Sequence, residues 1–464
     1  MRIISILILS LLVILSCKQD PQTNTEKQKP TSTSSSDIDK ELPDYAKNAT
    51  IYEVNLRQYT QEGTFNSFVP HIDRLAKMGV DILWFMPINP ISVKNRKGEL
   101  GSPYAVADYK DVNPEYGTMQ DFDNMVSAIH AAGMKIIIDW VPNHTGWDNP
   151  WITAHPEWYT QDAAGNIIDP IDYNTGESWG WTDVADLNYD NKEMRKEMIN
   201  SLLFWINERN LDGFRMDVAH GVPDDFWDEC SDALFSNGKL FMLSEGEVPN
   251  HRNNQNFHMD YGWSFHHLMN DIAKGEKNVT DIYAWKADNE SKYNKGFHMN
   301  FTSNHDENTW AGTEFERMGD GHQAFAVLAQ TFEGMPLIYS GQEEPLKKRL
   351  EFFTKDPIGF QNYSYADFYT KLNDLKDRNK AMWNGEHGGP VQFIGESEKI
   401  IGFQREKDGD KVIVMINLSD KPAEFNVISH INGVKDIFTG KSVHYHDGDK
   451  VPMQPWEYIV ASSN

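Results

Sequence analysis

The chain has 464 residues, with 43 basic and 69 acidic side chains and a formal net charge of −26. This length allows about three ordinary domains, although one α/β barrel can take up roughly 250 residues or more. The acidic balance disfavours nucleic acid and anionic substrates, because phosphate binding needs a basic surface. A content of 39% hydrophobic and 24% charged residues is typical of a globular protein and excludes a multispan membrane protein.

The N-terminus has the pattern of an export signal. Arg2 precedes a weakly polar run, Ile3 to Ser16, which is too short to span a bilayer as a mature helix. The run ends in Val13-Ile14-Leu15-Ser16 before Cys17 and resembles a bacterial lipoprotein signal, in which Cys17 becomes the lipidated first residue. An ordinary cleaved signal and a single anchor helix are the alternatives. We expect an exported lipoprotein anchored in the outer membrane, facing the periplasm or the cell surface.

Residues 17–42 follow as a flexible tether. The stretch from Lys18 to Lys40 is rich in Ser, Thr, Gln, Pro and Lys, and Ile38 is its one large apolar residue. Such a composition buries too little apolar surface to order the backbone.

From Ala49 to about Tyr339, short apolar runs end in polar residues and alternate with stretches of helical spacing. This alternation is typical of βα units around a parallel sheet. The expected strands are eight, the number that a closed barrel needs: Thr50–Val54, Asp81–Phe85, Lys135–Ile138, Gly213–Met216, Phe241–Leu243, Phe257–Met259, Phe297–Phe301 and Leu337–Tyr339. A Thr118-x-x-Asp121 cap begins one of the helical stretches between them.

Polar side chains follow four of the expected strands. Because catalytic groups of such barrels lie at the carboxyl ends of the strands, these side chains should converge on one rim. Each acidic residue could instead cap the next helix or face water, but the set in matching positions favours a catalytic site. The residues are Asp139, Asn143 and His144 after the third strand, Asp217 after the fourth, Glu245 after the fifth, and His305 and Asp306 after the seventh.

Two facing carboxyls can cleave a glycosidic bond with retention, one as nucleophile and the other as proton donor. Their pKa values must then differ. Arg215 lies two positions before Asp217 and faces the same side of the strand, so its charge should keep Asp217 ionised. Glu245 is then the proton donor, and Asp306 could bind sugar hydroxyls. Metal-assisted hydrolysis is the competing chemistry, but no H-x-H or H-E-x-x-H spacing occurs at the strand ends.

With these residues in hand, the chain from about Pro43 to the C-terminus resembles the α-amylase family, glycoside hydrolase family 13. The matching segments occur in family order: GVDILWFMPINP (Gly79–Pro90), SPYAVADY (Ser102–Tyr109), DWVPNH (Asp139–His144), ADLN (Ala185–Asn188), DGFRMD (Asp212–Asp217), FMLSE (Phe241–Glu245), SNHDE (Ser303–Glu307) and GMPLIYSGQEE (Gly334–Glu344).

The resemblance implies a role for each matching residue. It makes Asp217 the nucleophile, Glu245 the acid/base and Asp306 the stabiliser of the transition state. It also implies a structural calcium ion bound through Asn143 and Asp186, and no cofactor for catalysis. The residues that it places around the cleaved bond are Tyr104, Asp139, His144, Arg215, His305 and, by a looser alignment, Arg349.

Two local features differ from the family pattern or compete with it. Many α-amylases carry a Lys-His pair ending four residues after the nucleophile, but here Val218-Ala219-His220-Gly221 follows Asp217. Because the Lys-His pair is absent here, neither calcium binding nor the family's leaving-group preferences can be inferred from it. Glu247, which follows a glycine, could be mistaken for the acid. Glu245 is preferred because it directly ends the apolar strand.

The resemblance also predicts the domains. Residues 43–144 and 184–384 form an (β/α)8 TIM barrel of the α/β class, and residues 145–183 form a small inserted domain after the third strand. Most of the many aromatic rings in this insert are expected to pack within it, and stacking on glucose is the alternative. Residues 385–464 form a C-terminal antiparallel β-sandwich domain, because Lys399–Arg405 and Lys411–Leu418 flank an Asp408-Gly409 hairpin signal.

The expected function is that of a retaining α-glucan hydrolase that cuts α-1,4 bonds in starch, glycogen or maltooligosaccharides. An α-1,6-glucosidase, a cyclomaltodextrinase and a transglycosylase of the same family share the catalytic trio and stay open. An inactive lipid-anchored glucan-binding protein is the alternative of another class, but a decayed site should have lost a carboxylate. The expected partners are the glucan and, through the lipid, a membrane.

Overall fold

A computed structural model describes residues 38–172 and 175–463 of the protein. The expected signal segment, Cys17 and nearly all of the expected tether lie outside these residues. The unit described below is Asp39–Asn464. No helix in the described part of the chain has the length and apolar character needed to cross a membrane.

Eight parallel strands close into a barrel, in which neighbours follow the order of the chain and the last strand pairs with the first. The register joins Ile51 to Leu337 on one side of the first strand and to Ile82 on the other. The strands are β1 (Ile51–Val54), β2 (Ile82–Phe85), β3 (Lys135–Trp140), β6 (Gly213–Met216), β7 (Phe241–Ser244), β8 (Met259–Tyr261), β9 (Phe297–Asn300) and β10 (Met335–Tyr339). This closed barrel confirms the predicted fold class.

The sixth barrel strand was predicted two residues too early. The run Phe257–Met259 is apolar, but the backbone N–H of Phe257 donates to the carbonyl oxygen of His251 and so caps the preceding helix. Pairing with the neighbouring strand therefore starts at Met259 and extends to Tyr261.

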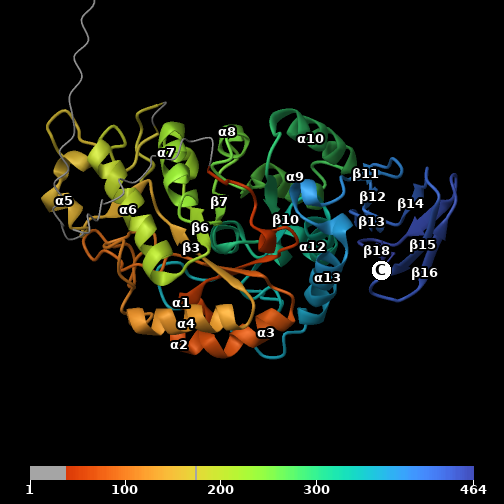
Figure 1. Ribbon diagram of the computed structural model, residues 1–464. Helices are drawn as coiled ribbons and strands as arrows, with labels where there is room; N and C mark the ends of the chain where they lie inside the picture. Colours follow the sequence, from red (N-terminus) through yellow and green to blue (C-terminus); the bar gives the residue numbers. More distant parts are fainter. Residues whose placement is uncertain (1–37, 173–174, 464) are drawn as a thin grey trace, which may run out of the picture. The chain divides into compact units, whose positions relative to one another are not determined.

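Helices cover the outside of the barrel (Figure 1). The α4 helix begins at the predicted cap, where Thr118 and Asp121 bond each other's backbone N–H, and it buries Phe122, Met125, Val126 and Ile129 against the strands. The helices are α1 (Leu56–Tyr59), α2 (Phe65–Phe68), α3 (Ile72–Lys77), α4 (Met119–Ala131), α6 (Lys192–Arg209), α7 (Asp224–Phe235), α8 (Pro249–Asn253), α9 (Trp263–Ala273), α10 (Val279–Lys292), α11 (Glu314–Met318), α12 (His322–Thr331) and α13 (Ala366–Arg378). Single turns occur at η2 (Asp44–Ala46), η3 (Val69–His71), η5 (Ala219–Gly221), η6 (Glu307–Ala311), η7 (Gly319–Gly321), η8 (Lys380–Met382) and η9 (Gly385–His387).

The predicted insert lies between β3 and α6 of the barrel. Two short antiparallel strands, β4 (His144–Gly146) and β5 (Val184–Asp186), lie at its base and pair His144 with Asp186. Between them the chain forms α5 (Trp151–Ala154), η4 (Pro156–Trp158) and irregular loops. This base holds the insert at the carboxyl end of β3.

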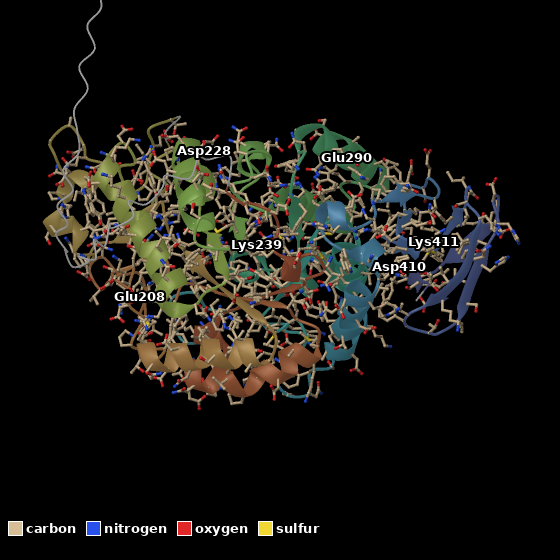
Figure 2. All side chains as sticks on the ribbon, in the orientation of Figure 1. Glu208, Asp228, Lys239, Glu290, Asp410 and Lys411 are labelled. Carbon is tan, nitrogen blue, oxygen red and sulfur yellow. The ribbon has the colours of Figure 1, made fainter. Side chains whose placement is uncertain are left out.

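The C-terminal residues form antiparallel sheets that pack on α12 and α13 (Figure 1). Asp408 and Gly409 both have positive φ, +53° and +93°, as the predicted tight hairpin requires. Asp410, labelled in Figure 2, accepts the backbone N–H of Lys380 and ties this hairpin to the end of the barrel. The strands are β11 (Gln392–Phe393), β12 (Ile400–Lys407), β13 (Asp410–Asn417), β14 (Ala423–Asn426), β15 (Ile431–Asp436), β16 (Ser442–Tyr445), β17 (Lys450–Met453) and β18 (Tyr458–Ser462).

Candidate active site

A cleft of about 820 Å³ opens at the carboxyl ends of the barrel strands. Six of the predicted residues line it: Tyr104, His144, Asp217, Glu245, His305 and Asp306. Asp139 and Arg215 lie beneath them and are fully buried. The barrel therefore brings together side chains from β3, β6, β7 and β9, as the strand-end pattern predicted.

Arg215 is the central cation of the site. Its Nη1 lies 2.7 Å from Asp217 Oδ1 and 2.8 Å from Asp139 Oδ1. Its Nη2 lies 2.9 Å from Glu245 Oε1. One guanidinium thus serves three carboxylates, and Asp139 and Glu245 join the predicted partner Asp217.

Burial and the shared guanidinium of Arg215 act in opposite directions on the pKa values of these carboxyl groups. Burial raises the pKa of Asp217 well above its usual range, and Arg215 only partly offsets this effect. Burial also raises the pKa of Asp139, to about 6. Burial favours neutral Glu245 too, but Arg215 and the Val218 N–H outweigh it and lower the pKa of Glu245. The pKa of the expected nucleophile, Asp217, is thus raised in this structure, and that of the expected proton donor, Glu245, is lowered.

Val218 holds the second oxygen of Glu245. Its backbone N–H donates to Glu245 Oε2 at 2.6 Å. To aim this N–H, Val218 adopts a left-handed conformation with φ +45°, which is rare for a β-branched residue. Such strain costs on the order of 1–3 kcal/mol and is typical of functional sites. Glu247, the rejected alternative, accepts hydrogen bonds from Ser264 instead.

Tyr104 links the predicted sugar-binding residues. Its hydroxyl donates to Asp139 Oδ2 at 3.0 Å and lies 2.8 Å from His305 Nε2. The Tyr104 and His305 rings also stack, 5.5 Å apart at 18°. Burial lowers the pKa of His144 to about 4, so this imidazole is neutral near pH 7.

Aromatic side chains form two walls of the cleft. Trp179 and Trp181 stand on the insert, with ring centroids 4.7 Å apart. On the other side are Phe352 and Trp310, and Trp310 is 57% exposed. Trp310 belongs to η6, a π-helical turn that directly follows Asp306. Exposed ring faces around buried carboxylates suit a polar ligand with apolar faces, such as a sugar.

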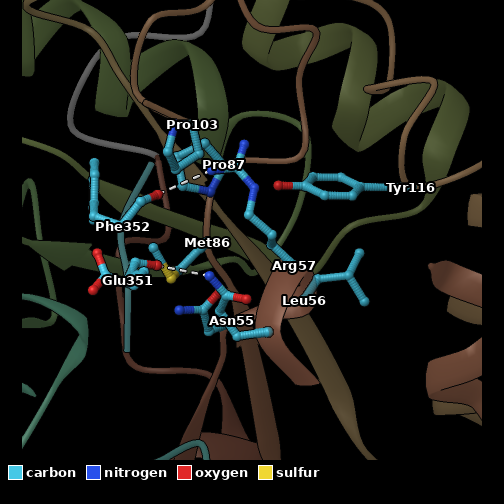
Figure 3. A pocket seen from close by; sticks show the side chains of 10 residues that line it. Asn55, Leu56, Arg57, Met86, Pro87, Pro103, Tyr116, Glu351 and Phe352 are labelled. Atoms are coloured by element: carbon cyan, nitrogen blue, oxygen red, sulfur yellow. Dashed lines mark hydrogen bonds between the residues drawn. The ribbon is translucent and has the colours of Figure 1, made fainter. Parts of the chain in front are cut away.

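Arg57 fixes the loop that carries Phe352. Its Nη1 donates to the carbonyl oxygens of Gly101 and Phe352, at 2.9 and 3.0 Å (Figure 3). Phe352 in turn lies nearly parallel to the Tyr104 ring, 6.1 Å away at 8°. The short helix α1, which follows β1, thereby positions one aromatic wall.

Three other described rings of the insert pack within it, as expected for most of its rings. Trp158 and Tyr159 are buried, and Trp151 packs edge-on against Trp158. Trp179 and Trp181 are the exceptions, since they face the cleft.

Arg349 is not in the lining of the cleft. Its Nε donates to Glu316 Oε2 at 2.9 Å, and nearly half of its side chain is exposed. The chain after β10 is irregular there, so the position of Arg349 could not be inferred from strand spacing.

Asn143 and Asp186, the two residues that the resemblance assigns to calcium, are both buried at the base of the insert. The side-chain oxygen Oδ1 of Asn143 lies so close to Gly221 that a Cβ at that glycine would be 2.7 Å away. Within residues 38–172 and 175–463, no group of three or more His, Cys, Asp or Glu side chains is arranged to hold a metal ion. Calcium takes six to eight oxygen ligands. The two residues do not by themselves fit that requirement.

Several residues of the site were not predicted from the sequence, and Glu53 and Trp310 are two of them. Glu53 lies fully buried under His305, and Trp310 lines the cleft. Glu53 is a charged residue in the interior of an expected apolar strand, as Arg215 is, and this was the available signal. Trp310 follows the SNHDE segment by three residues.

Comparison with known proteins agrees with this geometry. The family described as "Alpha amylase, catalytic domain" matches residues 30–436. The chain belongs to the α-amylase family. "Alpha-amylase 3" of Dictyoglomus thermophilum is 26% identical, over 89% of this chain and 93% of its own. "Glucan 1,6-alpha-glucosidase" of Streptococcus pneumoniae is 24% identical, over 76% of this chain and 73% of its own.

Among solved structures, a noncanonic maltogenic α-amylase from Thermotoga neapolitana superposes with a TM-score of 0.80 at 26% identity. The match covers 90% of this chain and 99% of that one. The protein is thus an enzyme of the α-amylase type, with a (β/α)8 barrel and a C-terminal β domain.

Proposed function

We propose that this α-amylase family enzyme is a retaining α-glucan hydrolase that cuts α-1,4 bonds in starch, glycogen or maltooligosaccharides. One observation carries the proposal: Asp217 and Glu245 contact the same guanidinium at the floor of a cleft walled by Trp181 and Trp310. A nucleophile and a proton donor on one centre are what double displacement needs.

In the proposed reaction Asp217 attacks the anomeric carbon while Glu245 gives its proton to the leaving oxygen. The bond to that oxygen breaks, and a glycosyl ester forms on Asp217. Glu245 then takes a proton from water, whose oxygen displaces Asp217. Double displacement needs Asp217 ionised and Glu245 protonated, so entry of the sugar has to lower the pKa of Asp217 and raise that of Glu245. Asp306 stabilises the positive charge that develops on the sugar ring.

Product analysis tests this proposal. Soluble starch, maltoheptaose, pullulan and isomaltose are each incubated with the enzyme, and products are separated by chromatography. NMR of the first product decides the stereochemistry. Maltooligosaccharides released with the α-configuration are expected, and β-configured products would contradict the double displacement.

The same assay separates the alternatives within the family. The printed name of the Streptococcus pneumoniae relative refers to α-1,6 bonds. Cleavage of isomaltose but not of maltoheptaose would favour that activity here. Ring opening of cyclodextrins would favour a cyclomaltodextrinase. Products longer than the substrate would favour a transglycosylase. Binding without any turnover would favour the inactive glucan-binding protein.

We also propose that the enzyme is exported and acylated at Cys17. The support is the sequence pattern alone, an apolar run that ends at a cysteine after a small residue. Mass spectrometry of the N-terminal peptide would detect the lipid, and Cys17→Ser should release the protein from membranes. Protease treatment of intact cells would separate surface exposure from a periplasmic location.

A further inference from the structure

Glu53 is a buried carboxylate to which the proposed reaction gives no direct part. It belongs to β1, and its side chain is fully buried. Its Oε1 lies 2.5 Å from Nδ1 of His305, which follows β9. Its Oε2 has no hydrogen-bond partner among the described residues. Burying a carboxylate is costly unless a cation accompanies it, so this contact needs an explanation.

Both nitrogens of His305 act as donors. The Tyr104 hydroxyl gives its hydrogen to Asp139 Oδ2, so its oxygen accepts a hydrogen from His305 Nε2 at 2.8 Å. Nδ1 faces the Glu53 carboxylate, which only accepts. An imidazole that donates from both nitrogens is an imidazolium. His305 Nε2 is also 3.3 Å from Asp306 Oδ2, at the surface of the cleft.

We infer that Glu53 is a positioning residue that holds His305 as an imidazolium, with its Nε2–H on the Tyr104 hydroxyl and its positive charge beside Asp306 at the cleft. Glu53 touches no substrate and acts through His305. A fixed positive charge beside Asp306 opposes the rise that burial causes in the pKa of that carboxyl group and so favours its ionised form. The kinetic part of this inference rests on the proposed glucan cleavage, while the charge of His305 does not.

The charges around the ring support a cation. Burial lowers the pKa of His305, and Arg215 does too, but Asp306 and Glu53 outweigh them and raise it to about 9. Burial raises the pKa of Glu53, and His305 and Arg215 oppose that rise. The other titratable groups near this pair are Asp139, Glu245, Tyr104, Tyr261 and Tyr339.

The test separates charge from orientation with two variants. Glu53→Gln keeps an acceptor for Nδ1–H but removes the charge, whereas Glu53→Asp keeps the charge but shortens the reach. Labelled histidine is followed by NMR across pH, and His305→Gln identifies the signal. We expect His305 to titrate about one pH unit or more lower in Glu53→Gln. In Glu53→Asp its pKa should stay raised.

Kinetics on maltoheptaose complete the test. Glu53→Gln should lower kcat about 10- to 100-fold with little change in KM, and activity should fall at a lower alkaline pH than in the parent. Glu343→Gln is the matched control, because Glu343 is also fully buried and paired with a cation, Arg74, but lies outside the cleft lining. It should lose stability without a change in the pH profile.

Three results would overturn the inference. The first is a wild-type His305 that titrates below pH 7, a measurement that does not depend on the Glu53 variants folding. The second is an unchanged titration in a folded Glu53→Gln protein. The third is a kinetic loss in Glu343→Gln equal to that in Glu53→Gln. If the wild type cleaves no glucan while the titration shifts as expected, the proposed function fails and the role of Glu53 toward His305 stands.

Discussion

Replacing Arg215 by methionine should make the stability of the barrel depend on pH. The substitution keeps a long side chain but leaves Asp139, Asp217 and Glu245 buried without the guanidinium that all three contact. Removing one partner of a buried ion pair typically costs about 3–5 kcal/mol. The carboxylates of the variant can reduce this cost only by binding protons.

The protons that the variant binds determine how its free energy of unfolding changes with pH. Without Arg215 the folded-state pKa of the cluster rises further above the value of roughly 4 in the unfolded chain. The folded state then holds more protons than the unfolded state, so stability is present at low pH and is lost as pH rises toward the folded pKa. One extra proton changes the free energy of unfolding by about 1.4 kcal/mol per pH unit. Between pH 5 and pH 7.5, the deficit of the variant should therefore grow by about 3 kcal/mol.

Urea unfolding of the wild type and the variant at both pH values measures this deficit. Arg57→Met is the matched control, because Arg57 is also buried but its described hydrogen bonds go to backbone carbonyl groups. Its loss of stability should be the same at pH 5 and pH 7.5. An Arg215→Met deficit that does not change with pH would refute the view that one guanidinium neutralises the three carboxylates.

Other expected results concern catalysis, the barrel wall and calcium. Turnover on maltoheptaose should fall by several orders of magnitude in Asp217→Asn and in Glu245→Gln, with an unchanged circular dichroism spectrum. The control Glu247→Gln should keep turnover near that of the wild type. Near-normal turnover in Asp217→Asn and Glu245→Gln would contradict their roles. Gly213→Ala should prevent folding, because its Cβ would lie 1.9 Å from the Phe241 carbonyl oxygen, and a soluble variant with a normal melting curve would disprove this. Dialysis against EDTA should shift Tm by less than about 2 °C, and a larger loss reversed by Ca²⁺ would reveal ligands beyond the two predicted residues.

The sequence predicted the barrel because each buried strand is a short apolar run that ends in polar residues. It predicted the convergence of Asp217, Glu245 and Asp306 for the same reason, since the carboxyl ends of parallel strands meet at one rim. The position of β8 was wrong by two residues, because an apolar run does not reveal where ladder pairing begins.

The electrostatics of the site could not be predicted from spacing along one strand. Arg215 was expected to favour Asp217, but Glu245 on the neighbouring strand reaches the same guanidinium. The Glu53 contact was missed because its partner, His305, is 252 positions away in the chain. The Glu53 contact depends on the closed barrel, which brings the first and the seventh barrel strands to a common centre.

Closure of the barrel also has a consequence for synthesis. The strand β1 obtains its second neighbour only when β10 pairs with it, at Ile51 and Leu337. A growing chain therefore exposes an unpaired β1 edge until nearly the whole catalytic region has left the ribosome, and such edges promote aggregation. We expect nascent or truncated chains that end before Met335 to depend on chaperones, whereas the completed chain folds without a free edge in its central sheet.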